Sequence, residues 1–146
     1  MINNDTVTIR ATVSFPALDV FETFKGQPTD KYGVQLANLS GPAVERLEEL
    51  GIEVKFKDDE LNRGQFIHCR SQFPITNGGR FNTLFEADGR TPFEGLPSDI
   101  GYGSVVKAKI KTYTTKQGDA KPSIVALIVE ELAKPEVQDF AEEEVL

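Results

Sequence analysis

The fold is decided by the sequence GYGSVVKAKIKTYTTKQGDAKPSIVALIVEEL, residues 101–132. From Val105 to Tyr113 apolar and polar side chains alternate, which is typical of a strand with one buried and one exposed face. Residues 116–122 are rich in turn formers, and the run from Ile124 to Val129 is apolar at every position. Such a run is typical of a strand that is covered on both sides. We therefore expect a small, strongly curved sheet or a closed barrel with the second strand in its core.

The exposed face of the first long strand is a basic row that ends in an aromatic ring. It holds Lys107, Lys109, Lys111 and Tyr113. We expect the curvature of the sheet to place this row on a rim or in an outer groove.

Alternating side chains predict the other strands of the chain. These strands cover residues 6–15, 31–39, 52–57, 65–73 and 80–87. Phe15, Phe56 and Phe73 fall on the apolar faces of their strands, and Pro16 is expected to end the first strand. The total is six or seven strands, mainly antiparallel because long crossover connections are absent.

One short helix is predicted between residues 40 and 51. Ser40 is placed to cap its start, and Gly51 is placed to end it. The apolar faces of the strands predict a single core. We expect that core to contain Ile9, Val13, Val34, Leu36, Ile67, Cys69, Ile110, Val125 and Leu127.

Length and composition indicate one domain in a reducing compartment. A chain of 146 residues can bury roughly 70% of the surface that its unfolded form exposes. The single cysteine, Cys69, suits the cytoplasm, and we expect it to be a small buried apolar residue. The N-terminus has no secretory signal pattern, and no apolar run approaches the length that spans a bilayer. We expect a cytoplasmic protein without a membrane partner.

The charge is distributed unevenly along the chain. Residues 130–146 hold seven acids and one lysine, so they account for −6 of the formal net charge of −7. Residues 61–129 hold nine basic residues and five acids. The chain is therefore a near-neutral body with a basic second half and an acidic tail, and the basic half can bind a polyanion.

The sequence offers little catalytic material. His68 and Cys69 are the only residues of their kinds, and as neighbours in a strand they point to opposite faces. They cannot form a nucleophile and base pair, and they cannot supply the four ligands of a zinc site. Asp58 and Asp59 are better explained as a solvated turn than as a magnesium site. We expect no enzymatic activity, no cofactor and no bound metal.

Aromatic and basic residues are interleaved on three of the predicted strands. Single-stranded nucleic acid is held by a positive groove and by aromatic faces on which bases stack, each worth about 1–3 kcal/mol. Singly, a lysine row is more often a solvated strand face, and a phenylalanine is more often core. Together they form a candidate binding set of Phe66, His68, Arg70, Arg80, Phe81, Lys107, Lys109, Lys111 and Tyr113. Phe66 shares its face with His68 and Arg70, which core packing alone does not explain.

The chain resembles the OB-fold single-stranded-DNA-binding proteins of tailed bacteriophages. The resemblance rests on the order of four segments: Ser14-Phe15-Pro16, residues 31–36 (KYGVQL), residues 100–109 (IGYGSVVKAK) with 124–132, and an acidic tail that ends in a hydrophobic residue. It implies a mainly β fold, with a five-stranded Greek-key barrel, extra strands and one short helix. It also implies binding of single strands without sequence preference during phage DNA replication and recombination, in the host cytoplasm and outside the virion.

The same resemblance implies a division of the chain into an OB-fold domain over residues 1–133 and a disordered acidic tail over 134–146. The tail is implied to bind a phage DNA polymerase or helicase and to compete with DNA for the groove. Its partner-binding residues are expected to be Asp139, Phe140, Glu142, Glu143, Glu144, Val145 and Leu146. Its acids outnumber its bases, and its few apolar residues bury little surface, so we expect a mobile arm. A terminal strand or helix docked on the body is the alternative.

Two other classes of function fit the sequence. A structural phage protein, such as a tail or baseplate barrel, would use the lysine row to contact protein. A DNA-mimicking inhibitor would arrange its acids as a surface stripe. Fold analogy alone does not decide between these functions. The sequence leaves the oligomeric state open, including a homodimer.

Overall fold

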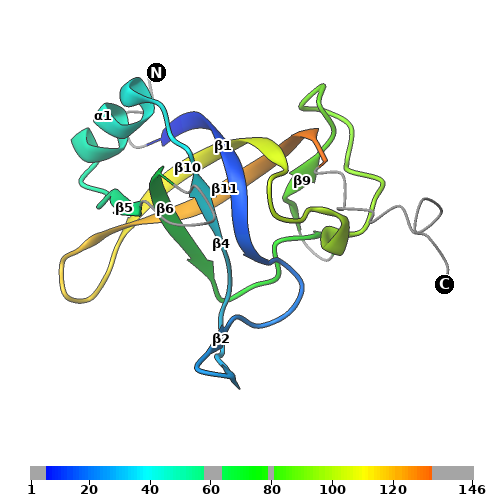
Figure 1. The fold of residues 1–146 in the computed structure, drawn as a ribbon, viewed down its shortest axis with the longest axis horizontal. Coiled ribbons are helices and arrows are strands. Elements are labelled where there is room, and N and C mark those ends of the chain that lie inside the picture. Colours follow the sequence, from blue (N-terminus) through cyan, green and yellow to red (C-terminus); the bar gives the residue numbers. More distant parts are fainter. Residues whose placement is uncertain (1–5, 58–63, 79–80, 133–146) are drawn as a thin grey trace, which may run out of the picture.

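The structure is a computed structural model that describes residues 6–57, 64–78 and 81–132. The longer elements are β1 (Thr6–Ala17), β4 (Tyr32–Ala37), α1 (Gly41–Glu49), β6 (Gly64–Ser71), β10 (Val105–Thr114) and β11 (Ala120–Glu131). The shorter elements are β2 (Thr23–Phe24), β3 (Gln27–Pro28), β5 (Lys55–Lys57), β7 (Asn77–Gly78), β8 (Phe81–Asn82), β9 (Leu84–Phe85) and the 3₁₀ helix η1 (Pro97–Asp99). Figure 1 shows their arrangement.

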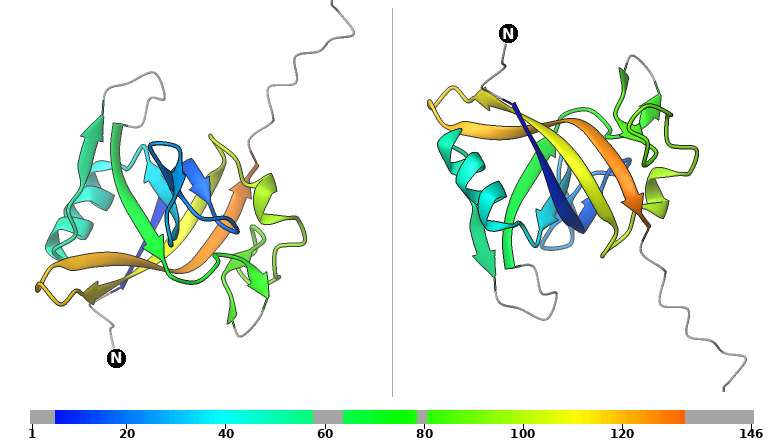
Figure 2. Two further views of the ribbon diagram at one scale, coloured as in Figure 1. Left: turned by 90° about the horizontal axis from the view of Figure 1, so that it is seen from below. Right: turned by 90° about the horizontal axis from the view of Figure 1, so that it is seen from above.

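Five of these strands form a barrel. β1 pairs antiparallel with both β4 and β10, β4 pairs with β6, and β10 pairs with β11. The long strands curve so that β11 lies beside β6 and closes the barrel, as both views of Figure 2 show. β5 and β9 extend the sheet at its two edges, and β9 pairs with β11 in parallel. This connectivity is the Greek-key OB-fold, with extra strands, so the predicted fold class is confirmed.

The alternation of the first long strand is confirmed. Val106, Ala108 and Ile110 are fully buried, whereas Lys109 and Lys111 on the opposite face are exposed. The helix begins where predicted, since the Ser40 side chain accepts a hydrogen bond from the Ala43 backbone N–H at 3.3 Å. Such a cap stabilises a helix by about 1 kcal/mol.

Eight of the nine predicted core residues are buried, and Val125 is the exception. Lys109 pairs with Ala126 but Ile110 pairs with Ile124, so Val125 is left over in a β-bulge. Its side chain is 44% exposed. The second long strand is therefore not covered on both sides along its whole length, because the bulge turns Val125 outward.

Three phenylalanines that the alternation placed inward are exposed instead. β1 does not end at Pro16 but continues to Ala17, with a shift of register after Ser14, so Ser14 is buried and Phe15 points outward. Phe73 lies beyond the end of β6. Phe56 lies in a strand of three residues at the edge of the sheet. In each case the regular two-residue period is broken or too short to fix the face.

Several other predictions concern residues that lie at the ends of the described ranges or outside them. The strand expected over 80–87 is two short strands, β8 and β9. The Asp58-Asp59 turn and the acidic tail lie outside the described residues. Within the described ranges, no helix is long and apolar enough to cross a membrane.

The contrast between two positions of β11 that lie two residues apart tests the packing of the barrel. Leu127 is fully buried, so Leu127→Ala should lower the free energy of unfolding by about 2–5 kcal/mol, as cavity-forming substitutions do. Val125→Ala at the exposed bulge should cost about 0.5 kcal/mol. Urea denaturation followed by circular dichroism measures both values. Equal losses would contradict the bulge.

Candidate nucleic-acid interface

The outer face of β4 and β6 carries the polar centre of the candidate site. Alternation along β6 buries Ile67 and Cys69, so His68 and Arg70 point away from the core. Gln35 of β4 pairs with His68 in the sheet, and Gly33 pairs with Arg70. The absence of a side chain at Gly33 leaves room for the Glu22 carboxyl group beside Arg70.

The connection from β1 to β4 carries the β2–β3 hairpin and brings aromatic rings to this face. Phe21 and Phe24 are exposed, and the Phe21 ring lies 4.9 Å from the Tyr32 ring. The Lys25 Nζ lies 5.4 Å from the centre of the Phe24 ring. Two backbone hydrogen bonds of 2.7 Å, from Glu22 N–H to the Lys31 carbonyl and from Thr29 N–H to the Glu22 carbonyl, close the base of the hairpin.

A second aromatic pair lies at the same end of the site. The rings of Phe15 and Tyr102 meet edge to face, with their centres 5.4 Å apart. Both side chains are nearly half exposed. A groove of about 410 Å³ is lined by both rings together with residues of the hairpin segment and of the β4–β6 face. Its lining includes Phe15, Phe21, Glu22, Phe24, Gln35, His68, Arg70 and Tyr102.

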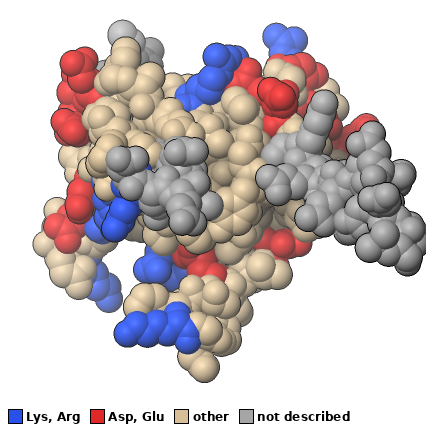
Figure 3. Space-filling view, viewed as in Figure 1, with Lys and Arg blue, Asp and Glu red and all other residues tan. Residues whose placement is uncertain are grey.

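The groove continues past Arg70 toward the β10–β11 hairpin. A second hollow, of about 320 Å³, is lined by Lys55, His68, Arg70, Tyr113 and Lys121 among others. His68 and Arg70 line both hollows, so the two hollows adjoin at these side chains. In Figure 3 basic side chains lie over the β2–β3 hairpin at the bottom of the view, and acidic side chains gather over α1 at the upper left.

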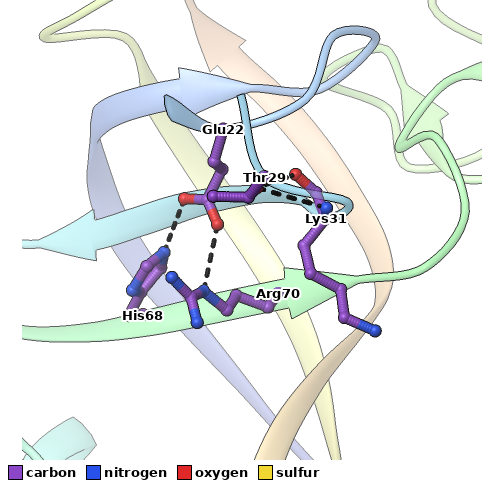
Figure 4. Close-up of polar contacts among 5 residues, drawn as sticks. All are labelled: Glu22, Thr29, Lys31, His68 and Arg70. Carbon is purple, nitrogen blue, oxygen red and sulfur yellow. Dashed lines mark hydrogen bonds and ion pairs between the residues drawn. The ribbon is translucent and has the colours of Figure 1, made fainter. Parts of the chain in front are cut away.

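One carboxylate holds the two polar residues at the centre of the site. Glu22 Oε2 lies 2.6 Å from His68 Nε2, and Glu22 Oε1 accepts a hydrogen bond of 3.1 Å from Arg70 Nε (Figure 4). The Glu22 side chain is 11% exposed and the Arg70 side chain 53% exposed. Glu22 therefore lies under the groove, while Arg70 remains accessible from solvent.

The structure brings together only part of the predicted binding set. His68, Arg70 and Tyr113 line one groove. The lysine row instead lies on the outer face of β10, where Lys107, Lys109 and Lys111 pair with Arg10, Thr8 and Thr6 of β1. It approaches the site through Lys109, which lines a larger groove of about 720 Å³ with Arg70 and Phe73.

Arg10 does not extend the lysine row as a free cation. Its Nε and Nη2 donate to the two carboxylate oxygens of Glu130 at 2.8 and 3.1 Å. The hydrogen bond from Arg10 holds the pKa of the Glu130 carboxyl below its usual range. The two side chains therefore neutralise each other at neutral pH.

The prediction for Phe66 is wrong. Its side chain is 3% exposed, so it has no ring face to offer a base. It lies toward the start of β6, where β5 pairs alongside and Lys55 is opposite in register. The outer face of β6 is open farther along the strand, at His68 and Arg70. Arg80 lies outside the described residues, and for Phe81 only the backbone of β8 is described.

Sequence reasoning missed the aromatic residues at this end of the groove. Phe15, Phe21, Phe24 and Tyr102 line the groove, and Glu22 holds its centre. The segment 15–24 is rich in apolar and aromatic residues. The sequence signal for a binding role is that the aromatic residues of this segment run up to Lys25-Gly26. These turn residues keep the hairpin, and therefore its rings, at the surface.

The part of the chain that the structure describes holds no cluster of metal-binding side chains. Within residues 6–57, 64–78 and 81–132, no group of three or more His, Cys, Asp or Glu residues could hold a metal ion. Burial raises the pKa of the Cys69 thiol, so the thiol stays protonated and behaves as the small apolar residue that was predicted.

Single-stranded-DNA-binding proteins of bacteriophages have the same fold. The single-stranded DNA-binding protein from bacteriophage Enc34, in complex with ssDNA, aligns with a TM-score of 0.63 and 16% identity, over 92% of this chain and 90% of that chain. The protein gp2.5, encoded by bacteriophage T7, aligns with a TM-score of 0.51 and 15% identity, over 97% and 98%. No family model and no curated protein matches the sequence. At these identities the likeness establishes the fold.

Proposed function

We propose that this protein binds single-stranded DNA without sequence preference and serves phage DNA replication or recombination. The observation that carries the proposal is the groove across β4 and β6. Aromatic rings line one end, Tyr113 and Lys121 line the other, and Arg70 lies where the two hollows meet. OB-folds bind oligonucleotides on this strand face and in the loops that flank it.

The groove has the parts that single-strand binding needs. Exposed rings such as Phe21, Phe24 and Tyr102 present faces on which unpaired bases stack, and stacking accepts any base because every base has a π-face. Arg70 and Lys121 supply positive charge for the phosphates between those bases. A duplex hides its base faces, so the groove favours single strands.

Two further parts of the proposal concern the ends of the path. The lysine row on β10 would hold DNA that leaves the groove past Arg70, since Lys109 and Arg70 line one hollow. The acidic tail over 134–146 would compete with DNA for the groove and bind a polymerase or helicase through its apolar end. The Enc34 protein in complex with ssDNA supports the proposal through its shared fold.

The central prediction concerns Arg70. The protein should bind a fluorescein-labelled thymidine oligonucleotide more tightly than a duplex, and the affinity should fall as salt rises. Arg70→Ala should lower the affinity about tenfold and reduce the salt slope by about 0.7, the value for one phosphate contact on a single strand. Fluorescence anisotropy at several salt concentrations measures both quantities.

Arg90→Ala is the matched control, because Arg90 is exposed on a loop and lines none of these hollows. It should leave affinity and slope unchanged. If the wild-type protein does not bind the oligonucleotide, the proposed function is wrong.

A second prediction concerns the lysine row. Lys109→Ala should lower the affinity for every sequence and flatten the salt slope by about 0.7, because one phosphate contact on a single strand is lost. Lys57→Ala removes the same charge from β5 and should change neither. An unchanged slope for Lys109→Ala would remove this lysine from the DNA path.

The third prediction concerns the tail. Deleting residues 136–146 should tighten binding to single-stranded DNA, most at low salt where charges are screened least, and should abolish binding to a polymerase or helicase partner. The comparison is the oligonucleotide affinity of the full chain and of the truncated chain at low and high salt. Equal affinities at low salt would refute competition by the tail.

A further inference from the structure

We propose that Glu22 is a positioning residue, which holds Arg70 and the aromatic hairpin segment in the geometry that receives a phosphate and its neighbouring bases. This inference rests on the proposed binding of single-stranded DNA and adds a specific role to an acid inside the groove. It is unexpected from charge alone, because a carboxylate close to a phosphate path repels the ligand.

The contact between Glu22 and Arg70 leaves the outer edge of the guanidinium available. Arg70 donates to Glu22 through Nε. Within the described residues, the structure shows no hydrogen bond from its two Nη groups. Arg10 differs, because both its Nε and its Nη2 donate hydrogen bonds to Glu130. A guanidinium held at Nε can still bind a phosphate with its Nη groups, in an orientation that is set before the ligand arrives.

The Glu22 carboxylate is fixed in place. Its backbone makes the two hydrogen bonds that close the base of the β2–β3 hairpin. Its carboxyl group lies over Gly33, where a β-carbon would be 2.7 Å from Glu22 Cδ and 2.8 Å from the Cys69 carbonyl oxygen. Both the backbone bonds and the close fit over β4 restrict the side chain. A carboxylate restrained in this way can support Arg70, and it is not free to swing aside when DNA enters the groove.

The same carboxylate ties the hairpin segment to β6. Through His68 and Arg70 it joins residue 22, next to Phe21, to the strand that forms the floor of the groove (Figure 4). Fixing the height of the stacking rings above the floor reduces the entropy lost on binding. Glu22 therefore connects the stacking part of the groove with its phosphate-binding part.

The test is Glu22→Gln, measured by anisotropy with the labelled thymidine oligonucleotide. Loss of a negative charge alone would tighten binding and steepen the salt slope. Positioning predicts the opposite: affinity about tenfold lower and a salt slope reduced by about 0.7, because a neutral amide oxygen accepts from Arg70 Nε more weakly than the carboxylate and no longer holds the guanidinium toward its phosphate. Glu49→Gln is the matched control, since Glu49 also pairs with an arginine, Arg46 at 3.2 Å, but on α1. It should bind as the wild type does.

A double-mutant cycle separates positioning from general weakening of the fold. Arg70→Ala should cost about tenfold in the wild type and less than about twofold in the Glu22→Gln background. Arg70→Lys keeps the charge but loses the planar Nε contact, so it should bind nearly as weakly as Arg70→Ala. This variant tests the proposal without altering Glu22, in case thermal denaturation shows that Glu22→Gln does not fold.

The outcomes distinguish this inference from the function on which it rests. If the wild type binds and Glu22→Gln binds equally well or more tightly, Glu22 does not position Arg70, and the proposed function stands. Additive effects in the cycle, or an Arg70→Lys variant as strong as the wild type, also overturn the inference. If the wild type fails to bind single-stranded DNA, both proposals are wrong.

Discussion

The pairing of β10 with both β1 and β11 is the constraint on which the rest of the structure depends. The inner face of β10, Val106, Ala108 and Ile110, is fully buried. Burying a large aliphatic side chain stabilises the folded state by about 1.5–3 kcal/mol. The barrel gains this stabilisation only when its strands curve until β11 lies beside β6. That closure fixes where β4 and β6 lie, and therefore where their outer face meets the flanking loops.

Two departures from regular strand pairing shape the surface of the barrel. At Phe15 the register of β1 shifts and φ is +46°, which turns the ring outward beside Tyr102 and leaves Ser14 buried. At Val125 a bulge opens β11 beside Lys109. A bulge adds one residue to one strand, so every side chain beyond it changes face. The barrel thus exposes apolar groups near its grooves that a regular ladder would have buried.

The net charge of the chain is a poor guide to the electrostatics of the groove. The formal charge is −7, yet Arg70 and Lys121 line the path across the barrel. Acidic side chains are spread over several parts of the surface, including α1 (Figure 3). Glu22 lies inside the groove but beneath Arg70, so its charge is offset before it reaches solvent. The electrostatic potential that a ligand meets in the groove depends on where the charges lie more than on the net charge of the chain.

The sequence by itself determined the barrel strands, the helix start at Ser40 and the outward faces of Arg70 and Tyr113, because side chains along an undisturbed strand alternate with a period of two. Only the tertiary structure decided which rings are available. Phe66 satisfies the same alternation as Arg70, but its side chain is buried whereas that of Arg70 is half exposed. Phe15 breaks the alternation at a bulge, and Glu22 reaches His68 and Arg70 across 46 and 48 residues of sequence. Contacts between segments so far apart depend on how the chain packs, which no local pattern records.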